Sequence, residues 1–169
     1  MAFRVESVYR QGITAGILGA TAVAVWFLIV DTIGGRPFFT PLLLGDALMG
    51  VFDREGTVPI ESATALIGIY TLFHYTAFCV SGIVVAVVVF VAQDTPSILG
   101  GFFILFIAFE LGSLGLVALL SHASTLGTLA WYQLMAGNVA ATVVMGWYFW
   151  NRHPELRTTM EHALDGAED

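Results

Sequence analysis

Long apolar segments separated by short polar breaks dominate the hydrophobic pattern of this chain. An α-helix needs about 20 apolar residues to cross the roughly 30 Å core of a bilayer. Four segments reach that length, approximately at residues 12–33, 65–92, 98–120 and 128–150. The breaks between them contain glycine, proline and polar residues, which are typical of turns. The pattern therefore predicts an all-α membrane protein, folded as a bundle of four transmembrane helices.

The loop after the first segment has a pattern of its own. Thr40 and Pro41 read as an N-cap followed by proline at the first helical position, and residues 41–52 then form a broad apolar face interrupted by Asp46. A helix of about twelve residues is too short to span, so we expect a short interfacial helix on the outer surface. It could shield the bundle from water, or it could offer a binding surface to a partner subunit or a lipid-soluble ligand.

Arginine placement predicts the orientation of the bundle. An even number of spans puts both termini on one side, and Arg4, Arg10, Arg152 and Arg157 flank the termini, whereas the first loop holds only two arginines. The positive-inside rule then favours cytoplasmic termini in the inner (plasma) membrane. Residues 1–150 form the transmembrane domain, and residues 151–169 form a short acidic cytoplasmic tail. Tryptophan and tyrosine mark both ends of the last segment, as interfacial anchors do: Trp131, Tyr132, Trp147, Tyr148 and Trp150.

Composition agrees with a membrane protein and excludes some function classes. Hydrophobic residues make up 57% of the chain and charged residues only 11%, against about 25% charged in soluble domains. The net charge of −7 and the absence of a basic patch argue against nucleic acid as a partner. The single cysteine, Cys79, excludes an intramolecular disulfide and the paired-cysteine chemistry of membrane thiol oxidoreductases.

One stretch carries a resemblance to a known group of proteins. The sequence WFLIVDTIGGRPFFTPLLLGDAL, from Trp26 to Leu48, has an aspartate ending the first span and a Gly-Arg-Pro-Phe element before Thr-Pro. It resembles a stretch in uncharacterised small integral membrane proteins of bacteria. The resemblance covers only the first span and its loop, and it implies a bacterial membrane origin without implying an activity.

Glu110, near the middle of the third segment, is the first candidate for function. A charge at that depth costs roughly 3 kcal/mol or more, so an intramembrane acid suggests a functional site. Counting from the segment ends places Asn138 at a similar depth, His74 and Gln133 about one turn nearer the outer surface, and Ser113 on the face of Glu110. These residues are a candidate intramembrane polar cluster. Glu110 beside His74 could relay a proton, or Glu110 could simply hydrogen-bond neighbouring helices together.

Small residues at helical spacing predict close helix packing. In bilayers such residues let helix backbones approach where no hydrophobic effect drives association. The candidate packing positions are Gly12, Gly16, Gly19, Ala108, Gly112, Gly115 and Gly137.

No motif names a reaction or a metal site. His153 and His162 follow the last span and His122 lies past the third, so the spacing predicts no metal centre, and no cofactor is indicated. Three hypotheses remain open: a non-catalytic accessory or self-associating subunit of a membrane complex, a proton-coupled small-molecule transporter using Glu110, and a quinone-, pigment- or haem-binding subunit. The first needs no unobserved partner for the buried charge. Whether the chain is an enzyme stays open, and the lack of a catalytic motif favours a protein that is not one.

Overall fold

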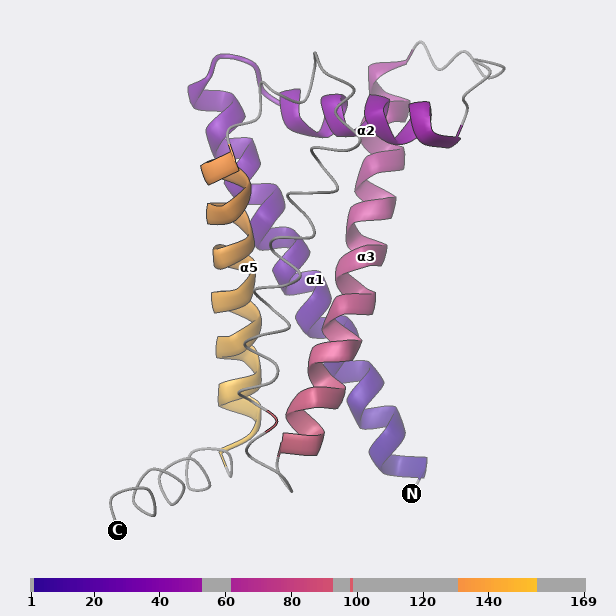
Figure 1. Cartoon of the computed structure of the whole chain (residues 1–169), viewed down its shortest axis with the longest axis vertical. Helices are drawn as coiled ribbons and strands as arrows, with labels where there is room; N and C mark the ends of the chain where they lie inside the picture. The colour runs from indigo at the N-terminus through magenta and orange to yellow at the C-terminus, as the bar shows by residue number, and fades with distance from the viewer. Residues whose placement is uncertain (1, 53–61, 93–97, 99–130, 155–169) are drawn as a thin grey trace.

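The described part of the chain consists of helices joined by turns. In the computed structural model, the residues described are 2–52, 62–92, 98 and 131–154, and none of them forms a strand. The helices are α1 (Ala2–Ile33), α2 (Phe39–Phe52), α3 (Ala63–Ala92) and α5 (Trp131–Arg152). Figure 1 shows α1, α3 and α5 running along the molecule while α2 lies across one end. The prediction of an all-helical protein is confirmed for this part of the chain.

The helix bounds follow the apolar segments except at the N-terminus. Helix α3 begins two residues before the predicted segment, and α2 and α5 also fall close to their predicted bounds. Helix α1 begins at Ala2, ten residues before the apolar segment at Gly12. The reason is that residues 2–11 contain neither glycine nor proline, so nothing stops the helix from continuing into a polar sequence. The predicted third segment lies outside the described residues, apart from Ile98.

Two of the described helices are long and apolar enough to cross a membrane. They are Glu6–Ile33, within α1, and Ala63–Ala92, which is all of α3. Helix α5 has sufficient length at 22 residues, but it carries Gln133 and Asn138 and ends in Asn151 and Arg152, so it is less apolar.

Helix α1 is the centre of the described structure, packing against α3 on one side and α5 on the other. It crosses α3 where glycines face each other. A Cβ atom added at Gly12 would lie 2.5 Å from the Ile83 Cα, and one added at Gly82 would collide with the Gly12 carbonyl oxygen. Gly16 lies equally close to the backbone of Phe78 and Cys79. The two helix backbones are therefore in direct contact at this crossing.

Buried apolar side chains fill the two ends of the bundle separately. Near the N-terminus of α1, the core consists of Ala15, Ala86, Val89, Met145 and Phe149. Near α2, Val23, Phe27 and Ala141 form a second cluster, which Leu43, Leu44 and Ala47 of α2 cover. Helix α2 thus contributes an apolar face to the bundle.

Other glycines mark further close contacts between helices. A Cβ atom at Gly19 would lie 2.7 Å from the Met145 sulfur of α5, and one at Gly137 would lie 3.1 Å from a carbon of the Trp26 indole. At Gly45, a Cβ atom would lie 2.5 Å from the Leu66 carbonyl oxygen, so α2 rests directly on the first turn of α3.

Candidate functional site

The Asp31 carboxylate joins the end of α1 to the start of α2. It accepts two hydrogen bonds from Thr40, one from the backbone N–H at 2.8 Å and one from the side-chain hydroxyl at 2.8 Å. Asp31 is 6% exposed and Thr40 is 1% exposed. A buried carboxylate is costly unless it is hydrogen-bonded, and the Thr40 N–H belongs to a helix N-terminus, where a negative charge is stabilised.

The first turn of α2 has all its donors paired. The Phe39 N–H donates to the Arg36 carbonyl, Pro41 has no N–H, and the Leu42 N–H donates to the Phe38 carbonyl. The prediction that Thr40 is the N-cap of this helix is therefore wrong. Thr40 lies inside the helix, its hydroxyl donates to Asp31 instead of capping, and Asp31 supplies the cap from the preceding helix. This arrangement requires a tight turn, in which Gly35 (φ 70°) and Phe38 (φ 66°) adopt left-handed backbone conformations.

His74 lies on the face of α3 that packs against α1. Its Nε2 atom is 3.1 Å from the carbonyl oxygen of Ala20. A carbonyl oxygen can only accept, so Nε2 donates, and the neutral ring keeps Nδ1 as an acceptor. The ring stacks on Tyr70 with centroids 5.5 Å apart and contacts Phe78 at 4.7 Å. Gly82 and Ala86 follow His74 at helical spacing, so one stripe of α3 carries the buried histidine and the close backbone contact with α1.

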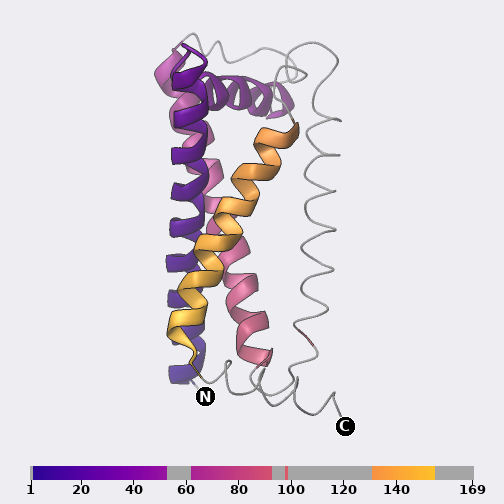
Figure 2. The same cartoon turned by 90° about the vertical axis from the view of Figure 1, so that its left-hand side faces the viewer.

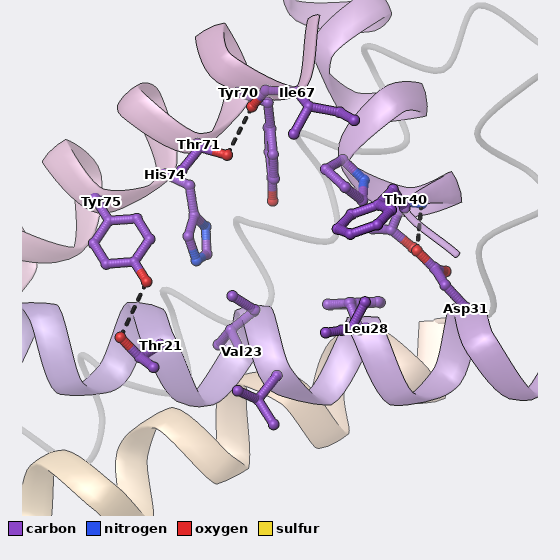
Figure 3. Close-up of a pocket in the computed structure, with 15 residues that line it drawn as sticks. Thr21, Val23, Leu28, Asp31, Thr40, Ile67, Tyr70, Thr71, His74 and Tyr75 are labelled. Carbon is purple, nitrogen blue, oxygen red and sulfur yellow. Dashed lines mark hydrogen bonds between the residues drawn. The ribbon is translucent and has the colours of Figure 1, made fainter. Parts of the chain in front are cut away.

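A cavity of about 260 Å³ lies between α1 and α3, next to α2. Its walls are mostly apolar, with Val23, Phe27 and Leu28 from α1 and Ile67 from α3. Phe38 and Pro41 line it at the α2 end, beside the hydrogen-bonded Asp31 and Thr40. Figure 3 shows Tyr70, His74 and Tyr75 extending from α3 toward α1 around this space, which Thr71 also lines.

Most polar groups around the cavity are already paired. The Tyr75 and Thr21 hydroxyls lie 3.0 Å apart, and the Thr71 hydroxyl donates to the Ile67 carbonyl at 2.7 Å. Two groups differ: within the described part of the chain, the Tyr70 hydroxyl has no hydrogen bond and His74 bonds only through Nε2. The cavity thus offers one hydroxyl and one ring nitrogen to a bound molecule.

The predicted polar cluster is only partly described. Glu110 and Ser113 lie outside the described residues, as do the packing candidates Ala108, Gly112 and Gly115. Asn138 lies half-buried on α5. Gln133 receives a hydrogen bond through its backbone carbonyl, from the Trp26 indole at 2.9 Å. His74 shares no hydrogen bond with Gln133 or Asn138; its partner is the Ala20 carbonyl of α1.

Several positions that matter in the structure were not singled out in the sequence. Gly82 and Gly45 make close contacts between helices, but in the sequence each lies within an apolar segment that was considered only as a whole. The sequence contained one sign of the Asp31–Thr40 pair, namely an aspartate near the end of an apolar segment followed nine residues later by Thr-Pro. An acid at that place can reach the next helix only if the turn between the helices is tight, and the sequence pattern does not predict how tight the turn is.

A second polar contact lies at the opposite end of the bundle. The His153 Nε2 atom is 2.8 Å from the Gln11 side-chain oxygen, which ties the end of α5 to α1. Within the described ranges, no group of three or more histidine, cysteine, aspartate or glutamate side chains could hold a metal ion.

Comparison with known proteins gives no relative. No protein-family model, no curated protein and no solved structure matches this chain. Inference about its function therefore depends on the geometry alone.

Proposed function

We propose that this chain is a four-span protein of the bacterial inner membrane that acts as an accessory or self-associating subunit of a membrane complex. Helices α1, α3 and α5 and the segment at 98–120 cross the bilayer. Helix α2 lies at the outer interface, and both termini are cytoplasmic.

The distribution of apolar side chains carries the membrane part of the proposal. Leu72 is 73% exposed, Val80 is 57% exposed and Val143 is 63% exposed, and many other large apolar side chains on α1, α3 and α5 are also exposed. By contrast, Asp31, Thr40 and His74 are buried. Large exposed apolar surfaces are rare on soluble monomers and mark contact with lipid or protein.

The direction of α2 and the position of aromatic residues support the proposed depth. Helix α2 lies across the ends of α1 and α3, as an interfacial helix lies across spanning helices (Figure 2). Trp147 is 66% exposed and Trp150 is 41% exposed near the end of α5. Tryptophan in such positions anchors a helix at the lipid headgroups.

Two exposed glycines favour the subunit role. Gly68 on α3 and Gly146 on α5 have open space where a Cβ atom would lie, with no described atom within 4 Å. In bilayers, glycines of this kind allow a second helix to approach closely. They differ from Gly12, Gly16 and Gly82, because those three glycines already contact another helix of the same chain.

The experiment measures the mass of the protein extracted from native membranes in a mild detergent or in lipid nanodiscs. We expect a species heavier than the 18.2 kDa chain, either a homo-oligomer or a complex with other subunits. The variant Gly146→Leu should weaken that association, because the added side chain separates the approaching helices.

Gly50→Leu provides the matched control. Gly50 on α2 also has open space around it, but it lies on the proposed interfacial helix and not on a spanning one. The control should associate as the unmodified chain does. A clean monomer in nanodiscs, or equal loss of association in both variants, would contradict the subunit role.

A further inference from the structure

We propose that the cavity between α1, α2 and α3 binds a neutral, lipid-soluble compound whose head is an aromatic ring with a hydroxyl group. Tyr70 and His74 would bind the hydroxyl, and the aromatic walls would hold the ring. This binding is distinct from the subunit role, and it does not depend on Glu110.

The two polar groups complement a hydroxyl. The Tyr70 hydroxyl has no partner within the described part of the chain, and His74 is committed only through Nε2. A ligand hydroxyl can accept from Tyr70 and donate to Nδ1 of His74, which satisfies both groups at once. The two rings are stacked, with centroids 5.5 Å apart, so they lie side by side on α3 and extend together toward α1 (Figure 3).

The remaining polar groups favour a ligand without charge. Both oxygens of the Asp31 carboxylate already accept hydrogen bonds from Thr40, and the Thr21 and Tyr75 hydroxyls are paired with each other. Among the described residues, no arginine or lysine lines the cavity, so an anionic head would lose its hydration without gaining a counter-ion, at a large cost in free energy. The Asp31 carboxylate also lines it, but the two Thr40 donors at the start of α2 already stabilise its negative charge, so a cationic head would gain less there than from an unpaired carboxylate.

The size and walls of the cavity favour a ring with a tail. The volume of about 260 Å³ lies just below the range of about 300–1,000 Å³ for small-molecule sites, so it suits a head group instead of a whole lipid. Phe27, Phe38 and Tyr75 line it together with Tyr70 and His74, and aromatic rings pack favourably against one another. The cavity is partly open, and α1 and α3 beside it carry exposed apolar side chains against which an alkyl tail could lie.

The test uses radiolabelled 4-octylphenol and the full chain in lipid nanodiscs, with empty nanodiscs to subtract partition into lipid. We expect saturable binding above that background. Unlabelled 4-octyltoluene, which has a similar shape without the hydroxyl, should compete about 10- to 100-fold more weakly than unlabelled 4-octylphenol, the effect of losing two hydrogen bonds.

Two pairs of variants locate the site. Tyr70→Phe should weaken 4-octylphenol binding about 3- to 10-fold and reduce the preference over 4-octyltoluene, because only the bond to His74 remains, whereas Tyr9→Phe, the same change at an exposed position outside the cavity, should have no effect. Ala24→Phe should block binding because Ala24 lines the cavity, and Ala77→Phe on α3, which does not, is its control.

Three results would overturn the proposal. They are binding that does not exceed the empty nanodiscs, equal competition by the two unlabelled compounds, and unchanged affinity in Tyr70→Phe. Because binding is measured on the isolated chain, these results are independent of the association test: a monomer that binds 4-octylphenol would contradict the subunit role alone.

Discussion

Individual polar residues in this protein act as links between helices. Asp31 joins α1 to α2 through Thr40, His74 joins α3 to the Ala20 carbonyl of α1, and Trp26 joins α1 to the Gln133 carbonyl of α5. In two of these links a side chain reaches a backbone carbonyl that already belongs to a helix. Each link satisfies a polar group that would otherwise be buried without a partner, which is the costly alternative.

The Asp31 link gives the first prediction, at the residue scale. Asp31→Ala leaves the buried Thr40 N–H and hydroxyl without an acceptor, so we expect a loss of about 1–3 kcal/mol in the free energy of unfolding. Reversible unfolding in mixed detergent micelles measures it. Asp46→Ala, at an exposed aspartate of α2, is the matched control and should change stability much less.

A double-mutant cycle separates the pair from its surroundings. Thr40→Val combined with Asp31→Ala should cost less than the sum of the two single changes, by about 0.5–3 kcal/mol, as for residues in direct contact. Additive losses would mean that Asp31 stabilises the protein by another route.

At the scale of elements, glycine decides how closely the helices pack. The crossing of α1 and α3 brings Gly12, Gly16 and Gly82 together, and Gly45 lets α2 rest on α3. Gly12 and Gly16 stand out in the sequence because they recur at small-xxx-small spacing. Gly82 and Ala86 have the same spacing, so the sequence also carried a signal for Gly82, but spacing within one helix cannot reveal which residue of another helix it meets.

The crossing gives the second prediction. Gly82→Leu should separate α1 from α3 and destabilise the protein by about 1–3 kcal/mol, the usual cost of overpacking, or more because the clash involves backbone. The matched control is Gly50→Leu on α2, where open space surrounds the glycine and no partner helix is proposed to approach.

Thermal unfolding of both variants in the same detergent makes the comparison. We expect Gly82→Leu to unfold at a clearly lower temperature than the unmodified chain and Gly50→Leu to unfold near it. Equal melting temperatures for Gly82→Leu and Gly50→Leu would mean that the crossing is not a close one.

For the whole molecule, the proposed topology predicts which residues can be reached from outside the cell. In a Cys79→Ser background, Asp46→Cys on α2 should react with a membrane-impermeant maleimide in intact cells. Glu6→Cys near the start of α1 should react only after permeabilisation. Both positions are exposed in the structure, so accessibility within the fold does not bias the result.

The reverse labelling pattern would mean that α2 faces the cytoplasm and the start of α1 faces outward, with the helices of the bundle unchanged. Labelling of both cysteines in intact cells would contradict the spanning of α1, because its two ends would then lie on the same side. The unsubstituted Cys79→Ser chain measures background labelling.

The sequence by itself determined where the described helices lie and that two of them could cross a membrane. These properties depend on local composition: apolar runs of sufficient length, broken by glycine, proline and polar residues. The N-terminal extension of α1 was not predicted, because the apolar pattern marks a span and not the helix that continues past it.

Only the tertiary structure decided which side chains meet. Helical spacing in the sequence puts Tyr70, Thr71 and His74 on one face of a helix. It does not show that this face meets α1, that His74 bonds Ala20, or that a cavity remains beside them. Likewise, Asp31 was visible as an aspartate ending an apolar run, while its pairing with Thr40 required the turn between α1 and α2. The physical reason is that helical spacing fixes directions around one axis, whereas contacts depend on how the axes cross.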